Sequence, residues 1–140
     1  MKKVVVSGGF DPVHVGHIRM FKEAKKLGEK LIVILNNDNW LRSKKDYCFM
    51  NEDDRKEILE SIKYVDDVLI SFHEVNDKDT GVTRELSFLT PDVFANGGDR
   101  TDKNTPEQEL CELLGIEMVF NVGGEKVRSS SELVGDKRDI

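Results

Sequence analysis

Short apolar runs rich in β-branched residues alternate with segments of helical period along this chain, and this alternation constrains the fold more than any other feature. Such alternation is typical of a mostly parallel sheet with helices packed on its faces. At 140 residues the chain has the size of one domain. We therefore expect one α/β domain, residues 1–140, with five strands at residues 3–7, 31–35, 67–71, 93–95 and 117–120.

Between the first strands, two segments carry the signals of helices. Apolar residues recur at helical spacing from Ile18 to Leu27, before Gly28, a residue type that often ends a helix. Asn51 is the predicted N-cap of a second helix, over about residues 52–63. The polar stretch 36–50 that precedes it is predicted to be a long loop, and loops of this length inside compact domains are often functional.

The second half of the chain carries three further helix signals. A weak helix is predicted at about residues 82–89. Residues 105–108, Thr-Pro-Glu-Gln, predict a helix start, because Thr caps and Pro suits the first helical position. Residues 129–132, Ser-Ser-Ser-Glu, form a capping-box pattern that opens a short final helix. The helix after 105–108 is expected to have three leucines on its apolar face and a glycine at its end: Leu110, Leu113, Leu114 and Gly115.

Composition excludes several classes of protein. The net charge of -6 argues against a nucleic-acid-binding protein, since phosphate backbones are bound by basic surfaces. The apolar run after the first lysines spans only residues 4–6, too short for a signal peptide or a membrane span. Cys48 and Cys111 lack CxxC spacing and are expected to be buried thiols. We expect a cytoplasmic protein with no membrane partner.

Residues 8–17, GGFDPVHVGH, form the most informative turn, because it joins the first strand to the first helix. Ligands of open parallel sheets bind beyond the carboxyl ends of the strands. His14 and His17 can point from the first helical turn toward one spot, where the N–H groups and dipole of the helix also point. Gly16 would let a phosphate approach the backbone closely. The pattern predicts an anion site.

Two other interpretations of the histidine pair are open. A zinc site needs at least a third ligand, for which Asp11 is the candidate. Alternatively, His14 and His17 simply cap or pack the helix. The glycines, together with the strand before and the helix after, favour the anion site over both.

Four segments together resemble the cytidylyltransferase-like group of the nucleotidyltransferase superfamily. The turn at 8–17 resembles its HxGH signature, and residues 55–69, RKEILESIKYVDDVL, resemble its arginine-led helix and following strand. Residues 91–100, PDVFANGGDR, resemble its GGD-type turn, and residues 127–133, VRSSSEL, resemble its ISTT-type helix start. The segments occur in the family's order and cover most of the chain, with the glycerol-3-phosphate cytidylyltransferase branch the most similar.

The resemblance implies a single Rossmann-like sheet with strand order 3-2-1-4-5 and transfer of a nucleoside monophosphate from a triphosphate. The resemblance implies catalytic roles for His14, His17, Lys44 and Arg55, and acceptor binding by Lys44, Lys45 and Arg55. Alternatively, the lysines are solvated surface residues, and Arg55 forms an ion pair with acids such as Glu52. The residues that the resemblance assigns to the nucleotide are Gly9, Phe10, His14, Gly16, His17, Gly97, Asp99, Arg128, Ser129, Ser130 and Ser131.

For the nucleotide-binding residues outside the HxGH turn, plainer roles stay open. The serines at 129–131 can be ordinary helix caps, the turn at 97–99 can be a plain loop, and Trp40 fits packing or a site rim better than a stacking platform. The sequence also departs from the family at positions 9 and 124, where Gly replaces a hydroxyl or thiol residue and an arginine, respectively. Asn96 replaces a lysine of one branch.

The resemblance favours CMP transfer from CTP to a phosphorylated alcohol or sugar such as glycerol 3-phosphate, with pyrophosphate released. The alternative in the same class is adenylyl transfer from ATP to a sugar phosphate of the heptose type or to a flavin or pantetheine precursor. A rival from another class is a non-catalytic nucleotide-binding module. The family further implies Mg²⁺ on the triphosphate and a homodimer.

Overall fold

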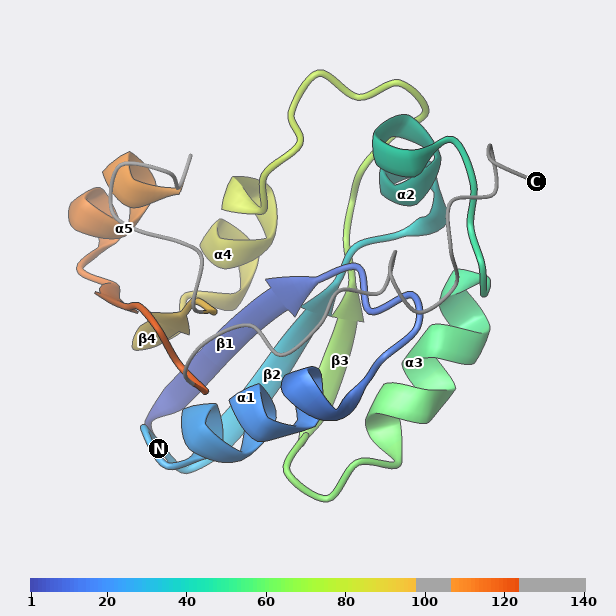
Figure 1. Ribbon diagram of the computed structural model, residues 1–140. Helices are drawn as coiled ribbons and strands as arrows, with labels where there is room; N and C mark the ends of the chain where they lie inside the picture. Colours follow the sequence, from blue (N-terminus) through green and yellow to red (C-terminus); the bar gives the residue numbers. More distant parts are fainter. Residues whose placement is uncertain (98–106, 124–140) are drawn as a thin grey trace.

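The computed structural model, which describes residues 1–97 and 107–123, is built on a five-stranded parallel sheet of order β3-β2-β1-β4-β5 (Figure 1). Both the Rossmann-like α/β architecture and the strand order are confirmed. Because every pairing is parallel, the carboxyl ends of all strands lie along one edge. The strands are β1 (Lys3–Gly8), β2 (Lys30–Leu35), β3 (Asp67–Ile70), β4 (Val93–Ala95) and β5 (Glu117–Val119).

Helices cover both faces of the sheet. Phe21 and Leu59 pack into one core cluster under α1 and α3, and Leu86 and Cys111 pack into the other under α4 and α5. The short helix α2 lies beyond the carboxyl ends of the central strands (Figure 1). The helices are α1 (Val15–Lys25), α2 (Asp38–Lys45), α3 (Glu52–Glu60), α4 (Thr83–Leu89) and α5 (Gln108–Leu114).

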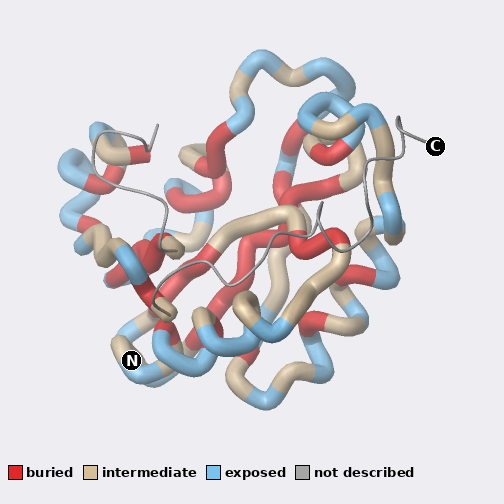
Figure 2. Tube along the Cα trace, viewed as in Figure 1, coloured by how far each residue is buried: buried red, intermediate tan, exposed pale blue. Residues whose placement is uncertain are grey.

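The central strand β2 shows why these residues form a covered sheet. Its odd-numbered residues, Leu31, Val33 and Leu35, belong to the cluster beneath α1 and α3. Ile32 and Ile34 point to the opposite face and pack beneath α4 and α5. All five are at most 5% exposed, so the strand is apolar on both faces, as parallel sheets require (Figure 2).

The prediction of a loop over residues 36–50 is wrong, because residues 38–45 form α2. Asn37 caps the helix by accepting a hydrogen bond from the Trp40 N–H, and its side-chain amide donates to carbonyls after β3. Within the helix only Leu41 is buried, so the sequence shows no apolar period there. Tertiary contacts at the cap therefore stabilise a helix that hydrophobic patterning does not reveal.

The predicted apolar face of the helix that ends at Gly115 is only partly correct. Gly115 does end α5, with a left-handed φ of 71°. However, Leu113 is 80% exposed and Leu114 44% exposed, whereas Cys111 is buried. A helix of seven residues presents only about two turns to the sheet. The predicted start at Thr105 and Pro106 lies outside the described residues, as does the final helix at 129–132.

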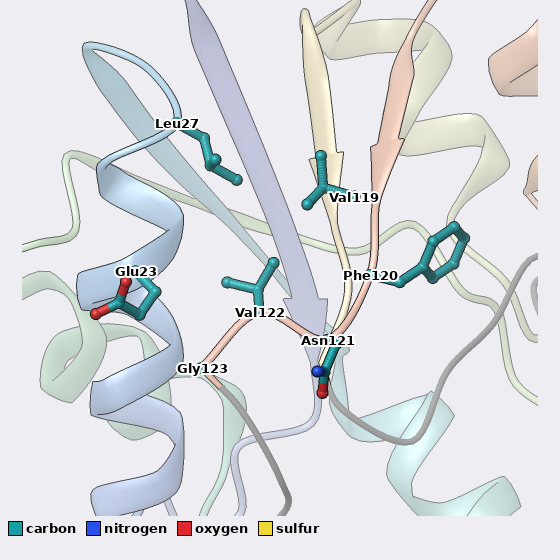
Figure 3. Close-up of a pocket in the computed structure, with 7 residues that line it drawn as sticks. All are labelled: Glu23, Leu27, Val119, Phe120, Asn121, Val122 and Gly123. Atoms are coloured by element: carbon teal, nitrogen blue, oxygen red, sulfur yellow. The ribbon is translucent and has the colours of Figure 1, made fainter.

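An open cavity of about 440 Å³ lies between α1 and the chain that leaves β5 (Figure 3). Gly123 closes its lower side with a φ of 87°, and a Cβ there would lie 2.9 Å from the Met20 Cα atom. Glycine is required at this close approach. None of the predicted site residues that the structure describes lines the cavity. Within the described part of the chain, no helix is long and apolar enough to cross a membrane.

Leu59 and Leu113 offer a matched test of this core. Leu59→Ala removes a fully buried side chain beneath α3 and should lower the free energy of unfolding by about 2–5 kcal/mol. Leu113→Ala should change it by less than about 0.5 kcal/mol, because that side chain is exposed. Urea unfolding of both variants measures the difference. Equal losses would contradict the packing described for α5.

Candidate functional site

The N-terminus of α1 is capped by the histidine pair itself. His14 is the N-cap, and its Nδ1 atom accepts a hydrogen bond of 3.1 Å from the Gly16 N–H. His17 Nδ1 accepts one of the same length from the His14 N–H. These reciprocal bonds form a capping box in which two imidazoles take the usual places of hydroxyl and carboxylate.

The capping bonds also decide where each imidazole carries its proton. Because both Nδ1 atoms accept, each neutral ring is protonated at Nε2. The two rings are stacked, with centroids 3.8 Å apart and an angle of 24° between planes. Phe10 packs edge-on against His17, at a centroid distance of 4.8 Å, and so holds the pair from the core side. Each ring therefore carries its N–H at Nε2, near the positive end of the helix.

Asp11 clamps the loop that leads into α3. The carboxylate is 2% exposed and accepts the backbone N–H groups of Phe49 and Met50, each at 2.6 Å. Asp11, the candidate third zinc ligand, therefore binds the backbone of this loop and not the histidines. No group of three His, Cys, Asp or Glu residues suited to a metal occurs among the described residues. The zinc interpretation gains no support.

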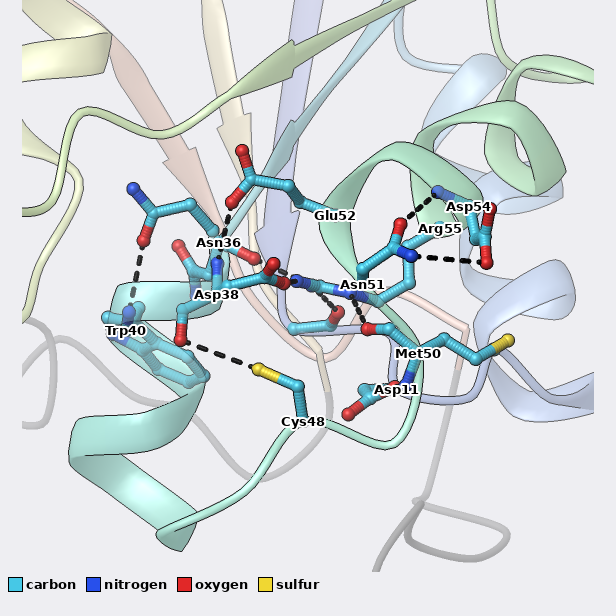
Figure 4. A network of polar contacts seen from close by, with 12 residues as sticks. Asp11, Asn36, Asp38, Trp40, Cys48, Met50, Asn51, Glu52, Asp54 and Arg55 are labelled. Atoms are coloured by element: carbon cyan, nitrogen blue, oxygen red, sulfur yellow. Dashed lines mark hydrogen bonds and ion pairs between the residues drawn. The ribbon is translucent and has the colours of Figure 1, made fainter.

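Arg55 is buried at the centre of a polar cluster at the carboxyl edge of the sheet (Figure 4). Its Nη1 atom donates to the Gly9 and Asn36 carbonyls, at 2.7 and 2.6 Å. Nε donates to the Met50 carbonyl at 2.9 Å, and Nη2 pairs with Asp38 at 2.7 Å. The ion-pair partner is Asp38 and not Glu52, which instead accepts the Asp38 N–H.

The two candidate lysines lie in the last turn of α2. Lys44 is exposed, and its Nζ atom lies 5.6 Å from the centroid of the Trp40 ring. Lys45 is partly buried. Trp40 donates its indole N–H to the Thr80 carbonyl at 2.9 Å, which fixes the ring at the rim of the sheet edge. The helix thus presents a basic turn at the carboxyl edge of the sheet.

The predicted glycines differ in their surroundings. A Cβ at Gly9 would lie 3.1 Å from Leu41 and 3.3 Å from Trp40, so these side chains occupy the space beside it. Gly97 follows β4, and a Cβ there would lie 3.7 Å from the Met20 sulfur, with no closer neighbour among the described residues. Gly124 lies outside the described residues. So do five of the predicted nucleotide-binding residues: Asp99, Arg128, Ser129, Ser130 and Ser131.

The structure brings the Gly9 turn, the histidine pair and Arg55 to one edge of the sheet. Sequence reasoning missed Asn36, Asn37 and Asp38, which all contribute to the polar cluster at this edge. A signal was present, because these three polar residues directly follow the buried strand β2, where sheets of this kind bind ligands.

Comparison with known proteins decides the family. The family model described as Cytidylyltransferase-like matches residues 5–136 of this chain. The chain belongs to this family. A curated FAD synthase from Pyrococcus abyssi (strain GE5 / Orsay) is 41% identical over 115 residues, which are 77% of this chain and 71% of that protein. A glycerol-3-phosphate cytidylyltransferase from Bacillus subtilis (strain 168) is 30% identical over 128 residues, 91% of this chain and 95% of that protein.

A solved structure agrees with the fold of this cytidylyltransferase-like chain. The crystal structure of a lipopolysaccharide core biosynthesis protein from Thermoplasma volcanium GSS1 superposes with a TM-score of 0.69 and 26% sequence identity. The match covers 86% of this chain and 95% of that chain. The resemblance stated from four sequence segments is therefore confirmed at the level of the family.

The Arg55–Asp38 pair predicts a large effect on stability. Asp38→Ala leaves a fully buried guanidinium without its charged partner and should lower the free energy of unfolding by about 3 kcal/mol. Glu57→Ala, an exposed change on α3, is the control and should stay within about 0.5 kcal/mol. Chemical denaturation measures both. A loss below 1 kcal/mol for Asp38→Ala would show that the pair does not organise this edge.

The two free cysteines should differ in reactivity. Burial, reinforced by the Glu107 carboxylate, raises the pKa of the Cys111 thiol to about 11. Burial and the nearby Asp38 raise the pKa of Cys48 as well, but Cys48 is only partly buried. A raised pKa leaves less thiolate at pH 8, so iodoacetamide should modify Cys48 slowly and Cys111 only after unfolding. Mass spectrometry of the alkylated peptides reports the order, and faster modification of Cys111 would contradict it.

Proposed function

We propose that this protein transfers CMP from CTP to a phosphorylated alcohol of the glycerol 3-phosphate type and releases pyrophosphate. The observation that carries the proposal is the stacked pair of Nε2-protonated imidazoles at the N-terminus of α1. A triphosphate bound there meets two hydrogen-bond donors and the positive end of the helix dipole. The similarity to a glycerol-3-phosphate cytidylyltransferase along 91% of this chain supports the choice of nucleotide and acceptor.

In the proposed reaction, a phosphate oxygen of the acceptor attacks the α-phosphorus in line. The bond from the α-phosphorus to the bridging oxygen breaks, and pyrophosphate carries away the electron pair. Negative charge grows on the bridging and equatorial oxygens, so donors aimed at those atoms lower the barrier. His14 and His17 supply these donors, and no covalent enzyme intermediate is needed.

The remaining residues divide between contact and positioning. Lys44, with Lys45 as its neighbour in the same turn, would bind the phosphate of the acceptor. Arg55 uses four N–H groups within the protein, so its role is to hold the Gly9 carbonyl, the end of β2 and the loop before α3 in register. Gly9, Phe10, Gly16 and Gly97 would shape the nucleotide site, together with Asp99, Arg128 and Ser129–Ser131 of the undescribed segments.

Mg²⁺ enters the proposal as part of the nucleotide substrate. The described residues include no cluster that would cage a cation. Magnesium in phosphoryl-transfer sites is commonly held by substrate phosphates with few protein ligands. Bound in that way, the ion would neutralise charge on the triphosphate, while the protein supplies the imidazole donors. A homodimer is a further part of the proposal, which sedimentation of the purified chain would test.

A second candidate is adenylyl transfer from ATP to FMN. The 41% identity to an FAD synthase over 77% of this chain favours it as the alternative. Incubation of the protein with Mg²⁺ and each of the four triphosphates, against glycerol 3-phosphate, sugar 1-phosphates and FMN, separates the candidates by pyrophosphate release. Turnover with CTP and glycerol 3-phosphate supports the proposal, and turnover with ATP and FMN alone replaces it. No turnover in any combination would support a binding module instead.

Substitution at His17 separates capping from catalysis. His17→Ala and His17→Asn both remove the Nε2–H donor and should lower kcat by about 10²- to 10³-fold. The Asn side chain keeps an acceptor for the His14 N–H, so His17→Asn should retain the thermal stability of the wild type. Lys22→Ala, an exposed change on the same helix, is the control for kcat. Activity within threefold of wild type in His17→Asn would refute the proposed role.

A further inference from the structure

The face of the sheet edge that lies beneath α4 carries a polar group that the proposed mechanism does not use. Along β2 the side chains alternate, and Ile32 and Ile34 pack on the α4 side. Asn36 continues the strand pairing, since its N–H donates to the Gly8 carbonyl at 2.9 Å. The alternation therefore places its side chain on the α4 side, opposite the face that α1 covers.

No donor within residues 1–97 and 107–123 bonds to the side-chain oxygen of Asn36. The residue is 5% exposed, and its Oδ1 atom is fully buried without a hydrogen bond. The backbone of the same residue is satisfied at both groups, by Gly8 and by Arg55. Buried polar atoms in folded proteins are nearly always paired, and an unpaired one lowers stability. An acceptor left open at the ligand-binding edge of a sheet indicates a donor that arrives with a ligand.

The backbone of Asn36 lies next to the Gly9 turn. Arg55 Nη1 bonds to both the Gly9 and Asn36 carbonyls, so these two residues are neighbours. The missing side chain of Gly9 faces the ring of Trp40, 3.3 Å from the Cβ that another residue would have. The indole is fixed to the Thr80 carbonyl and carries the Lys44 ammonium over its ring (Figure 4 shows Trp40 in the same cluster as Asn36). Trp40 and the Lys44 ammonium thus lie beside the Gly9 turn, to which Arg55 links the backbone of Asn36.

The strand order separates this place from the expected nucleotide site. The chain runs from β1 to β2 and β3 on one side and then to β4 on the other, so the switch point lies between β1 and β4. Nucleotides bind at such switch points. Asn36 follows β2, on the far side of β1 from β4. A ligand group that reached Asn36 would therefore belong to the acceptor and not to the nucleobase.

We propose that the Asn36 amide binds a hydroxyl group of the acceptor alcohol, so that the acceptor is a polyhydroxylated phosphate whose phosphate faces Lys44. This inference rests on the proposed transferase function and specifies its acceptor. A hydroxyl is a neutral donor that matches a neutral, buried amide oxygen, whereas a phosphate oxygen offers no proton to it. Asn36 is thus a specificity-determining residue that distinguishes a polyol from its deoxy analogue.

Asn36→Leu provides the test, measured by calorimetric titration of the full chain with glycerol 3-phosphate and with 1,3-propanediol phosphate, which lacks the middle hydroxyl. The wild type should bind the deoxy compound about threefold to tenfold more weakly, the equivalent of one neutral hydrogen bond. Asn36→Leu should bind both compounds equally and as weakly as the wild type binds the deoxy compound. Its melting temperature should equal or exceed that of the wild type, because an unpaired buried group is removed.

Asn39→Leu is the matched control. Its amide donates to the His73 carbonyl at 3.0 Å, so this variant should melt at a lower temperature and still prefer glycerol 3-phosphate. Equal binding of the two compounds by the wild type, or an unchanged preference in Asn36→Leu, would overturn the inference. If the wild type releases pyrophosphate but Asn36→Leu keeps its preference for glycerol 3-phosphate, only the hydroxyl site is refuted. If Asn36→Leu loses that preference but the wild type releases no pyrophosphate, only the transferase proposal is refuted.

Discussion

The buried guanidinium of Arg55 is the interaction on which the edge of this sheet depends. It lies on α3 and reaches the turn after β1, the residue after β2, the first turn of α2 and the loop before its own helix. A buried charge is tolerated only when it is paired and its donors are used. Those requirements fix four chain segments relative to one another, and Asp11 fixes the same loop from the other side.

This clamp separates the two halves of the proposed reaction. On the α1 side, the capping bonds hold two stacked imidazoles in one tautomer. On the α4 side, Trp40 and Asn36 border the place proposed for the acceptor. The Gly9 turn leads from β1 toward the histidine pair, and Arg55 ties its carbonyl to that of Asn36. Catalysis by positioning requires such rigidity, because misplacement by about 1 Å costs much of the rate.

Local signals in the sequence were sufficient wherever neighbouring residues decide the conformation. Asn51 caps α3 as expected, Gly115 ends α5, and β4 spans Val93–Ala95 as predicted. Sequence patterns failed to predict the structure where contacts between distant residues determine the conformation. Helix α2 depends on Asn37, whose amide reaches the chain after β3, and Leu113 faces solvent although its spacing suggested an apolar face. The sequence pointed to candidate residues where they form a motif, as in the HxGH turn, and gave no clear pointer to single polar residues at a strand end.

The sequence by itself determined the α/β class, the strand order through its family resemblance, and the histidine turn, because each depends on residues close together in the chain. Only the tertiary structure decided which atoms Arg55 bonds, which nitrogen of each histidine carries the proton, and that the Asn36 amide oxygen lies buried without a donor. The bonds from Arg55 to Asp38, Asn36 and Gly9 join residues 17 to 46 positions apart in the chain, whereas the histidine tautomers follow from bonds within residues 14–17 once α1 has formed. No periodicity or spacing encodes such contacts, since the geometry of the whole sheet sets them.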